Sequence, residues 1–476
     1  MGVMRFLVPS AEDLTAQAVQ TAYFAGREEI PSACRVTRTD DGVAVERSES
    51  DSGSFHIVWH TQGHGDLALS TATLIEQEAP YNLPVELARG TINRVRQQLA
   101  IWQSVGLVVS EKVTNSLAAA VHSFAQAASS LHEPLTARQH ASDALEAACD
   151  AGFELSTAYS DQALVARRRQ SPKFVPLLGA SVTSALSDQK VAAAFLGAFN
   201  TANVHFCWRD VESREGKYNW TTSDAQIAWA QANNLRICGG PLVQLDQQSF
   251  PDWLYLWEGD FDNLISVTGE YVRAVVTRYK GKVHLWQCAA RMNSGETMSL
   301  TEEQRLRLTV RIVEVTRTTD PRTPIFVTFD QPWAEYIGKR KMDLSPLTFA
   351  DALVRSELGL SGLGLEITAG TYAGATLPRD PIEFSRQIDR WTPMGLPLLI
   401  TLRLPEPTSD AAAADEQSKW VSTFVPLLLA KQAVQGIFWG LLKDQQPTDH
   451  AGGLFAADGQ AKPALNGLTA IKQTYK

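Results

Sequence analysis

The sequence predicts an α/β protein whose main part is a (β/α)8 TIM barrel, preceded by a small β-sandwich-like module and a helical insertion. Strand-like and helix-like segments alternate from about residue 172 to the end of the chain. Residues 1–83 contain short runs that alternate between apolar and polar residues, which is typical of β-strands. Residues 84–170 are rich in Ala, Leu and Gln, with apolar residues three and four positions apart, as in amphipathic helices. We therefore expect a β-rich module (1–83), a helical segment (84–170) and a barrel (171–476).

Composition is that of a globular protein and excludes several classes of partner. The 476 residues carry a net charge of −9, with 44% hydrophobic and 20% charged residues. A negative net charge disfavours binding to nucleic acid or to an anionic membrane surface. No apolar run approaches the roughly 18 residues that a membrane-spanning helix needs. The N-terminal sequence MGVMRFLVPSAEDL lacks the features of a secretory signal, which predicts a cytoplasmic protein.

Histidine and cysteine spacing does not predict a metal site or a cofactor. The five cysteines are scattered without C-x-x-C spacing, so we interpret them as buried thiols. His56, His60 and His64 lie close together, and a metal site is one interpretation of this group. The simpler interpretation, which we favour, places His56 and His60 on one strand face and His64 in a turn, because no cluster of carboxylates accompanies them. No nucleotide-binding or other cofactor motif is present.

The helical segment holds two to four predicted helices. Ser110 and Thr136 are candidate N-caps, and Pro134 is expected to break the helical pattern. The apolar stripe of residues 84–170 has two interpretations. It could pack against the neighbouring domains, or it could support a homo-oligomer.

Eight candidate strands follow residue 172, with amphipathic helical segments between them. Eight strands joined by helical crossovers in about 300 residues are typical of a (β/α)8 barrel. A doubly wound sheet is the alternative, but such sheets usually carry a Gly-rich phosphate-binding turn, and none is found. The candidate strands are VPLLGASV, NVHFCW, LRICGGPLVQL, KVHLWQC, PIFVTFD, GLGLEIT, LPLLITLRL and GIFWGLL.

Several motifs in residues 172–470 resemble one family, the glycoside hydrolase family 10 xylanases. The most similar stretch is RYKGKVHLW at Arg278–Trp286, a helix end, a turn and a short strand. Further similarities follow in the family's order: Trp208 to Glu212 with Gly216 to Trp220, Phe250 to Trp253, Asp320 and Pro321, Leu363 to Leu365, Leu396 to Thr401, and Phe438 to Leu441 with Gly453 to Phe455. The resemblance implies a TIM barrel of the carbohydrate-active type.

The same resemblance implies that the family's chemistry is absent. In the family, the acid/base glutamate follows strand four and the nucleophile glutamate ends strand seven. Arg291 and Leu402 stand at these two positions. A leucine cannot act as a nucleophile, and an arginine stays protonated and cannot serve as acid and base.

Aromatic and polar residues remain near the predicted barrel mouth. Trp208, Trp333 and Trp439 are candidates for stacking on sugar rings, with packing as the alternative interpretation. Arg291 and Asp444 are further candidates for binding a substrate.

Glu366 and Asp330 end neighbouring predicted strands and are the candidate catalytic pair. One hypothesis is a relocated acid/base pair. The other, which we favour, is an ion pair of Arg291 with Asp330 or Glu366, because an arginine lowers the pKa of a nearby carboxyl and so opposes general-acid catalysis.

Three functional hypotheses remain open from the sequence. The barrel could bind a glycan or a related small molecule after losing hydrolysis, it could be an active glycosidase that uses Glu366 and Asp330, or it could be a scaffold for assembly. Fold alone does not decide between them.

Overall fold

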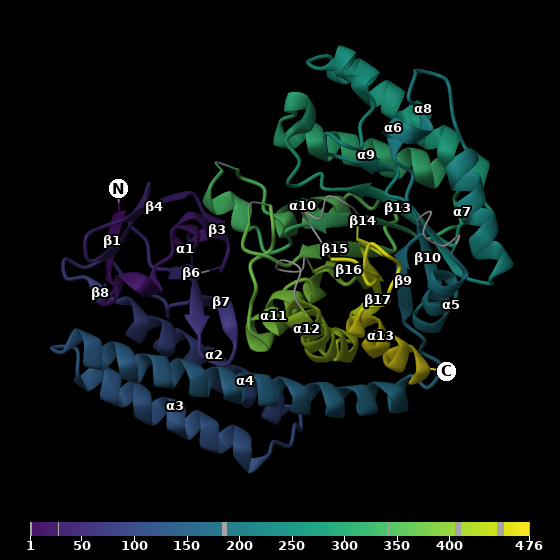
Figure 1. The fold of residues 1–476 in the computed structure, drawn as a ribbon. Coiled ribbons are helices and arrows are strands. Elements are labelled where there is room, and N and C mark those ends of the chain that lie inside the picture. Colours follow the sequence, from purple (N-terminus) through teal and green to yellow (C-terminus); the bar gives the residue numbers. More distant parts are fainter. Residues whose placement is uncertain are drawn as a thin grey trace.

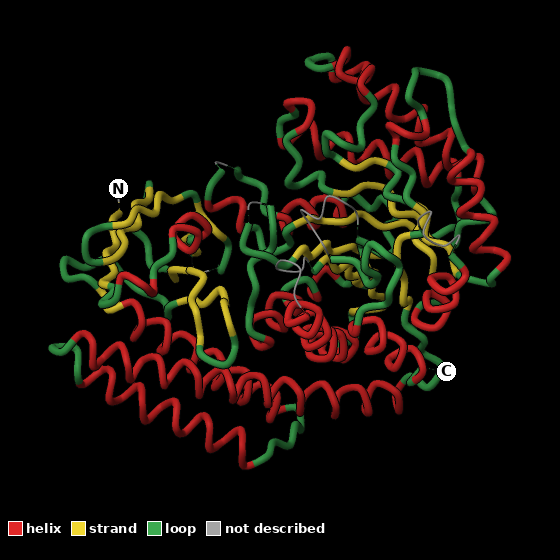
Figure 2. The backbone as a smooth tube through the Cα atoms, viewed as in Figure 1, coloured by secondary structure: helices red, strands yellow, loops and turns green. Residues whose placement is uncertain are grey.

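The computed structural model describes residues 2–26, 28–182, 188–340, 342–372, 374–404, 411–444 and 452–475. Its larger part is a closed, parallel barrel with helices around it (Figures 1 and 2). The predicted (β/α)8 fold is therefore confirmed. None of the helices in the described part combines the length and the apolar composition needed to cross a bilayer.

All eight predicted strands contribute to the barrel. The third is interrupted at Pro241 and forms two short pieces, β11 and β12, which both pair with β13. Pairing of β17 with β9 closes the ring. The strands are β9 (Leu177–Ser181), β10 (Thr201–Val204), β11 (Arg236–Gly239), β12 (Val243–Gln244), β13 (Leu285–Ala290), β14 (Ile325–Asp330), β15 (Gly362–Thr368), β16 (Leu398–Arg403) and β17 (Val434–Trp439).

Helices cover the outside of the barrel, and short helical turns follow several strands. The longer helices are α5 (Gln189–Ala198), α7 (Thr221–Ala232), α8 (Phe261–Tyr279), α9 (Glu302–Thr319), α10 (Pro346–Arg355), α11 (Pro381–Asp389), α12 (Ala411–Ala430) and α13 (Pro463–Gln473). The short ones are α6 (Trp208–Val211), η3 (Asp252–Trp257), η4 (Thr297–Ser299), η5 (Glu335–Gly338) and η6 (Thr392–Met394).

Side-chain alternation along each strand separates two apolar layers. Cys238, Phe326, Leu399 and Phe438 form a small cluster inside the barrel. The large apolar cluster lies on the outer face of the strands, between them and the helices, and Leu402 on β16 belongs to it. Because successive residues of a strand point to opposite sides, every second residue at a strand end faces the barrel mouth.

The N-terminal module consists of two four-stranded sheets, ordered β4-β5-β1-β8 and β3-β2-β6-β7. Phe6 and Phe55, one from each sheet, stack with ring centroids 4.8 Å apart, so the sheets pack face to face. The elements are β1 (Gly2–Leu7), η1 (Ala11–Asp13), α1 (Ala16–Thr21), β2 (Tyr23–Ala25), β3 (Pro31–Ser32), β4 (Cys34–Arg38), β5 (Gly42–Arg47), β6 (Ser54–Thr61), β7 (Gly65–Ser70) and β8 (Tyr81–Asn82).

Two local predictions for this half of the chain are wrong. Residues 1–83 were expected to be β structure, but Ala16–Thr21 form the helix α1, because the Thr15 hydroxyl accepts a hydrogen bond from the Ala18 amide at 3.0 Å and caps the helix. The helical pattern is broken at 130–133, next to Pro134 as expected, but Thr136 is not an N-cap: Pro134 begins the next helix, since proline fits the first turn, and Thr136 lies inside it.

Three helices, α2 (Leu83–Ser104), α3 (Glu111–Ser129) and α4 (Pro134–Gln170), form the helical segment. Figure 1 shows α4 running under both the β module and the barrel. At its end, the buried Arg167 guanidinium donates to the carbonyls of Leu429, Lys431 and Val434 at 2.6–2.8 Å. These bonds tie α4 to the end of α12 and the start of β17.

Loops of the barrel mouth contact the N-terminal module directly. The Ala68 amide of β7 donates to the carbonyl of Pro378 at 2.6 Å. Arg379 is fully buried, pairs with Glu335 at 2.7 Å and donates to the Tyr23 hydroxyl at 2.8 Å. The loops after β14 and β15 are therefore held against the module.

Candidate functional site

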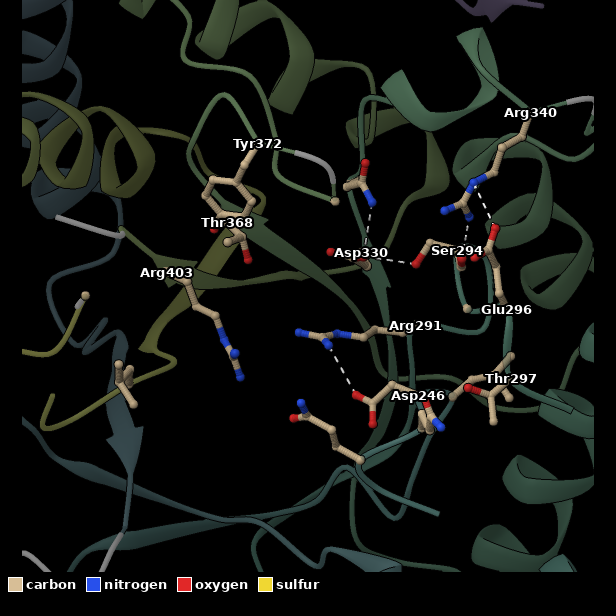
Figure 3. A pocket seen from close by; sticks show the side chains of 18 of the residues that line it. Asp246, Arg291, Ser294, Glu296, Thr297, Asp330, Arg340, Thr368, Tyr372 and Arg403 are labelled. Atoms are coloured by element: carbon tan, nitrogen blue, oxygen red, sulfur yellow. Dashed lines mark hydrogen bonds and ion pairs between the residues drawn. The ribbon is translucent and has the colours of Figure 1, made fainter. Parts of the chain in front are cut away.

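The ends of β13 and β14 carry an unusual backbone. Arg291 follows β13 with φ of +59°, and Gln331 follows β14 with φ of +42°. Residues other than glycine rarely adopt this left-handed region, and such strain, of about 1–3 kcal/mol each, concentrates at functional sites. The turn after Ala290 directs Arg291 into the barrel mouth (Figure 3).

Arg291 forms the central ion pair of the mouth. Its Nη2 lies 2.7 Å from Glu366 Oε1 and its Nε lies 3.3 Å from Glu366 Oε2, so the two groups face each other in a bidentate arrangement. Its Nη1 lies 3.2 Å from Asp246 Oδ2. Of the two ion pairs considered from the sequence, the structure contains the one with Glu366. The Glu366 carboxylate raises the pKa of Arg291 further above its usual value.

Glu366 lies beneath the floor of the mouth, with 6% of its side chain exposed. Burial favours the neutral acid, but the guanidinium groups of Arg291 and Arg403 outweigh it and lower the pKa of Glu366 to about 2. This carboxyl is therefore ionised at neutral pH, and both of its oxygens accept hydrogen bonds from Arg291.

Asp330 is the neighbouring carboxyl and behaves differently. Burial, reinforced by the Glu366 charge, raises the pKa of Asp330 to about 6. The Ser294 hydroxyl donates to Oδ2 of Asp330 at 3.0 Å. The Asn293 side chain holds the backbone of Asp330 through two bonds of 2.8 and 3.1 Å. Asp330 is thus fixed in place and lines the pocket with a partly protonated carboxyl.

Strand register explains why Asp330 and Glu366 belong together. They are direct partners in the parallel pairing of β14 and β15, so their side chains project on the same side. The sequence predicted that these neighbouring strand ends would bring the two carboxyls near each other. Their role as an acid/base pair stays a proposal.

The direction of the side chains at the end of β16, the seventh strand of the barrel, differs from what the resemblance implied. Leu402, which was expected from the resemblance to stand at the family's nucleophile position, is completely buried in the layer between strands and helices. The inward positions of β16 are taken by Leu399 in the barrel core and by Arg403 at the mouth. Leu402 therefore faces away from the pocket, and the side chain that points into it belongs to Arg403 (Figure 3).

The mouth holds a half-open pocket of about 450 Å³. Its lining is dominated by charged and hydrogen-bonding residues from the ends of several strands. Tyr372 is the only aromatic residue among those that line it in the described part of the chain. The lining residues used below are Asp246, Arg291, Ser294, Glu296, Asp330, Arg340, Thr368, Tyr372 and Arg403.

The predicted tryptophans lie outside this pocket. Trp208 and Trp439 are each 1% exposed and Trp333 is 4% exposed, so none presents a ring face to solvent. Trp439 lies behind the wall, where its indole N–H donates to the carbonyl of Gly452 at 3.0 Å. In this structure the three residues pack, which was the alternative interpretation.

Asp444 also lies away from the pocket lining. It is buried, pairs with Lys462 at 2.7 Å and accepts the amide of Gly453 at 2.8 Å. These contacts hold the chain after β17 together, and Gly452, next to this segment, lines the pocket.

Asp246 and His205 are among the residues near the mouth that the sequence analysis missed. Asp246 follows β12, and the carboxyl end of a predicted strand is the signal that should have identified it. His205 follows β10, and its ring reaches solvent although the barrel walls surround it. That enclosure, together with the Arg403 charge, lowers the pKa of His205 to about 4.

The described residues contain no group of three or more His, Cys, Asp or Glu side chains placed to hold a metal ion. His56 stacks on Tyr23, His60 pairs with Asp66 and His64 pairs with Asp150. The three histidines thus have separate partners.

Comparisons with known proteins agree with the geometry of the barrel. Residues 170–301 match the model of glycosyl hydrolase family 10. Endo-1,4-beta-xylanase C of Phanerodontia chrysosporium is 20% identical over 281 residues, which are 55% of this chain and 66% of that protein. Endo-1,4-beta-xylanase 3 of Hypocrea jecorina is 34% identical over 79 residues, 17% of this chain and 22% of that protein. The chain thus spans less than two thirds of the length of each of these relatives.

Solved structures resemble the barrel at low sequence identity. Xylanase 10B from Thermotoga petrophila, solved in complex with xylobiose, superposes with a TM-score of 0.52 at 17% identity and covers 64% of this chain and 97% of its own. Xylanase B from Clostridium stercorarium gives a TM-score of 0.51 at 18% identity and covers 63% and 98%. At these identities the similarity establishes the fold alone.

Proposed function

Because the barrel is glycoside hydrolase family 10-like, we propose that it binds a carbohydrate at its mouth without hydrolysing it. The observation that carries this proposal is the bidentate pairing of Arg291 with Glu366 at the centre of the mouth. Retaining hydrolysis needs two carboxyls that reach the anomeric carbon and its leaving oxygen. Here both oxygens of Glu366 are engaged by an arginine, and the carboxyl lies under the floor.

An open pocket supports ligand binding over a purely structural role. A scaffold has no need of an accessible mouth, and a cavity of about 450 Å³ is large enough for one or two sugar rings. Its polar lining suits hydroxyl groups. Since the tryptophans are buried, we expect hydrogen bonds to dominate recognition, with Tyr372 as the aromatic residue of the described lining.

A second candidate function is hydrolysis by relocated carboxyls, with Asp330 as general acid and Glu366 as its ionised partner. The pKa of about 6 for Asp330 favours it, because a general acid must keep its proton near the working pH. The engagement of Glu366 by Arg291 opposes it. Assembly through residues 84–170 stays a prediction, as does a cytoplasmic location.

Two measurements on the same protein separate the candidates. Calorimetric titration with xylotriose and other neutral oligosaccharides tests binding. Incubation with aryl β-glycosides and xylo-oligosaccharides tests hydrolysis by wild type, Glu366→Gln and Asp330→Asn. We expect binding without turnover. Turnover that disappears in both variants would establish the relocated pair instead, whereas the absence of binding and turnover would overturn both functions.

A further inference from the structure

Arg403 is held across a glycine at the end of the next strand. A Cβ atom at Gly440 would lie 2.6 Å from Arg403 Cγ and 2.8 Å from its Nε, so the arginine stem rests directly on the Gly440 backbone. Any larger residue at 440 would displace it. The close contact directs the guanidinium into the pocket, on the side formed by Thr368 and Tyr372 (Figure 3).

The guanidinium of Arg403 has few partners among the residues that the structure describes. Its Nε is buried without a hydrogen-bond partner, and 43% of the side chain is exposed. Glu366 is the only carboxylate within ion-pair distance among the described residues, at 3.4 Å, and it already accepts two hydrogen bonds from Arg291. The terminal Nη groups of Arg403 are therefore available to a ligand, while the buried Nε faces Glu366.

The other two arginines of the pocket are already engaged. Arg291 donates to Glu366 and Asp246. Arg340 donates to the Ser294 carbonyl at 3.0 Å and pairs with Glu296 at 3.1 Å. Of the three arginines, Arg403 is thus the one whose guanidinium donates no hydrogen bond to a described residue.

We propose that the ligand of this pocket is an acidic oligosaccharide, and that a uronic-acid carboxylate binds Arg403 beside Thr368. This inference rests on the proposed carbohydrate binding and names the class of ligand. A guanidinium matches a carboxylate with two parallel hydrogen bonds, which a sugar hydroxyl cannot provide. The Thr368 hydroxyl adds a donor on the same wall.

Charge in the pocket is compatible with this ligand. Among the carboxylates of the lining, Asp246 is paired with Arg291 and Glu296 with Arg340. Asp330 remains, and burial raises its pKa, which reduces its negative charge. The ligand carboxylate therefore meets the Arg403 guanidinium, whose ion pair to Glu366 is the longer of the two that Glu366 makes with arginines, and an aspartate with a raised pKa.

The test uses three probes that share one backbone: xylotriose, xylotriose with a glucuronic acid branch, and the same branched compound after reduction of its carboxyl to an alcohol. Calorimetric titration of wild type is expected to give at least about tenfold tighter binding of the acidic compound than of its reduced form, roughly the free energy of a charged hydrogen bond. Increasing salt should weaken only the acidic complex.

Variants then assign the preference to Arg403. Arg403→Gln should remove it, and Arg403→Lys, which keeps the charge but loses the planar donor set, should retain part of it. Gly440→Ala should reduce it by displacing the arginine stem. Arg355→Gln is the matched control, because that residue is 78% exposed on α10 and remote from the lining. Circular dichroism verifies that each variant folds.

The outcomes separate this inference from the proposed function. Equal affinity for the acidic and reduced compounds in wild type, or a preference that survives in Arg403→Gln, would overturn the inference and leave carbohydrate binding intact. If none of the three probes binds, carbohydrate binding itself fails, and the inference fails with it.

Discussion

Asp330 and Glu366 are direct partners on neighbouring parallel strands, yet their pKa values shift in opposite directions. Burial and the Glu366 charge raise the pKa of Asp330 to about 6. Arg291 and Arg403 overcome the burial of Glu366 and lower its pKa to about 2. Below about pH 6 the two neighbouring carboxyls therefore exist as one protonated acid, Asp330, and one anion, Glu366, and the arginines beside Glu366 decide which of the two keeps its charge.

The first prediction concerns pH and stability. The unfolded pKa of an aspartate is about 3.9, so the folded state binds the Asp330 proton more tightly. The contribution of Asp330 to stability is then fully present below that unfolded value and is lost as pH rises through about 6, by roughly 3 kcal/mol in total. Asp330→Asn should flatten this decline in urea denaturation between pH 4.5 and 7.5.

The contribution of Glu366 to stability changes with pH in the opposite direction and over a different pH range. Its lowered pKa contributes stability above about 4.5 that is lost as pH falls toward 2, outside the range measured. Asp351→Asn, on the exposed face of α10, is the matched control and should keep the wild-type slope. An unchanged slope in Asp330→Asn would contradict the assignment.

The second prediction concerns the ion pair of Arg291. Arg291→Met leaves Glu366 buried with only the more distant Arg403 as partner, so we expect a loss of about 3 kcal/mol in the free energy of unfolding. Glu366→Met in the same chain should recover most of that loss, because the unpaired charge is then gone. Chemical denaturation of the two single variants and the double variant gives the coupling energy. Additive losses would show that the pair has no special role.

The third prediction tests which face of β16 points into the mouth. Leu402→Glu places a charge in the apolar layer behind the strand and should destabilise the protein by more than about 3 kcal/mol. Arg403→Glu puts the same group into the open mouth and should cost less, although it approaches Glu366. Thermal unfolding of the two variants ranks them. The reverse ranking would mean that Leu402 faces the pocket.

A fourth prediction concerns the contact between the N-terminal module and the barrel. Arg379 has 1% of its side chain exposed and joins Glu335 of η5 to Tyr23 of β2. Arg379→Met leaves Glu335 buried and unpaired and should lose about 3 kcal/mol, whereas Tyr23→Phe removes one hydrogen bond and should lose about 1–2 kcal/mol. Hydrogen exchange in the loop after β15 should rise in both variants. Unchanged exchange would show that the module does not hold that loop.

Sequence alone determined the architecture of the barrel. Alternation of apolar strands and amphipathic helices fixes how many layers form, because each apolar face must be buried against another element. All eight predicted strands are present, and the strand-end residues Arg291, Asp330 and Glu366 were identified as neighbours, since the carboxyl ends of parallel strands meet at one face.

Tertiary structure alone decided the details of the site. A shift of one residue reverses the direction of a side chain, so the sequence pattern could not show that Leu402 faces outward and Arg403 inward. Burial of Trp208, Trp333 and Trp439 depends on neighbours that are distant along the chain. The pKa difference between Asp330 and Glu366 likewise arises from charges that four different strands bring together. No local stretch of sequence contains all of these charges.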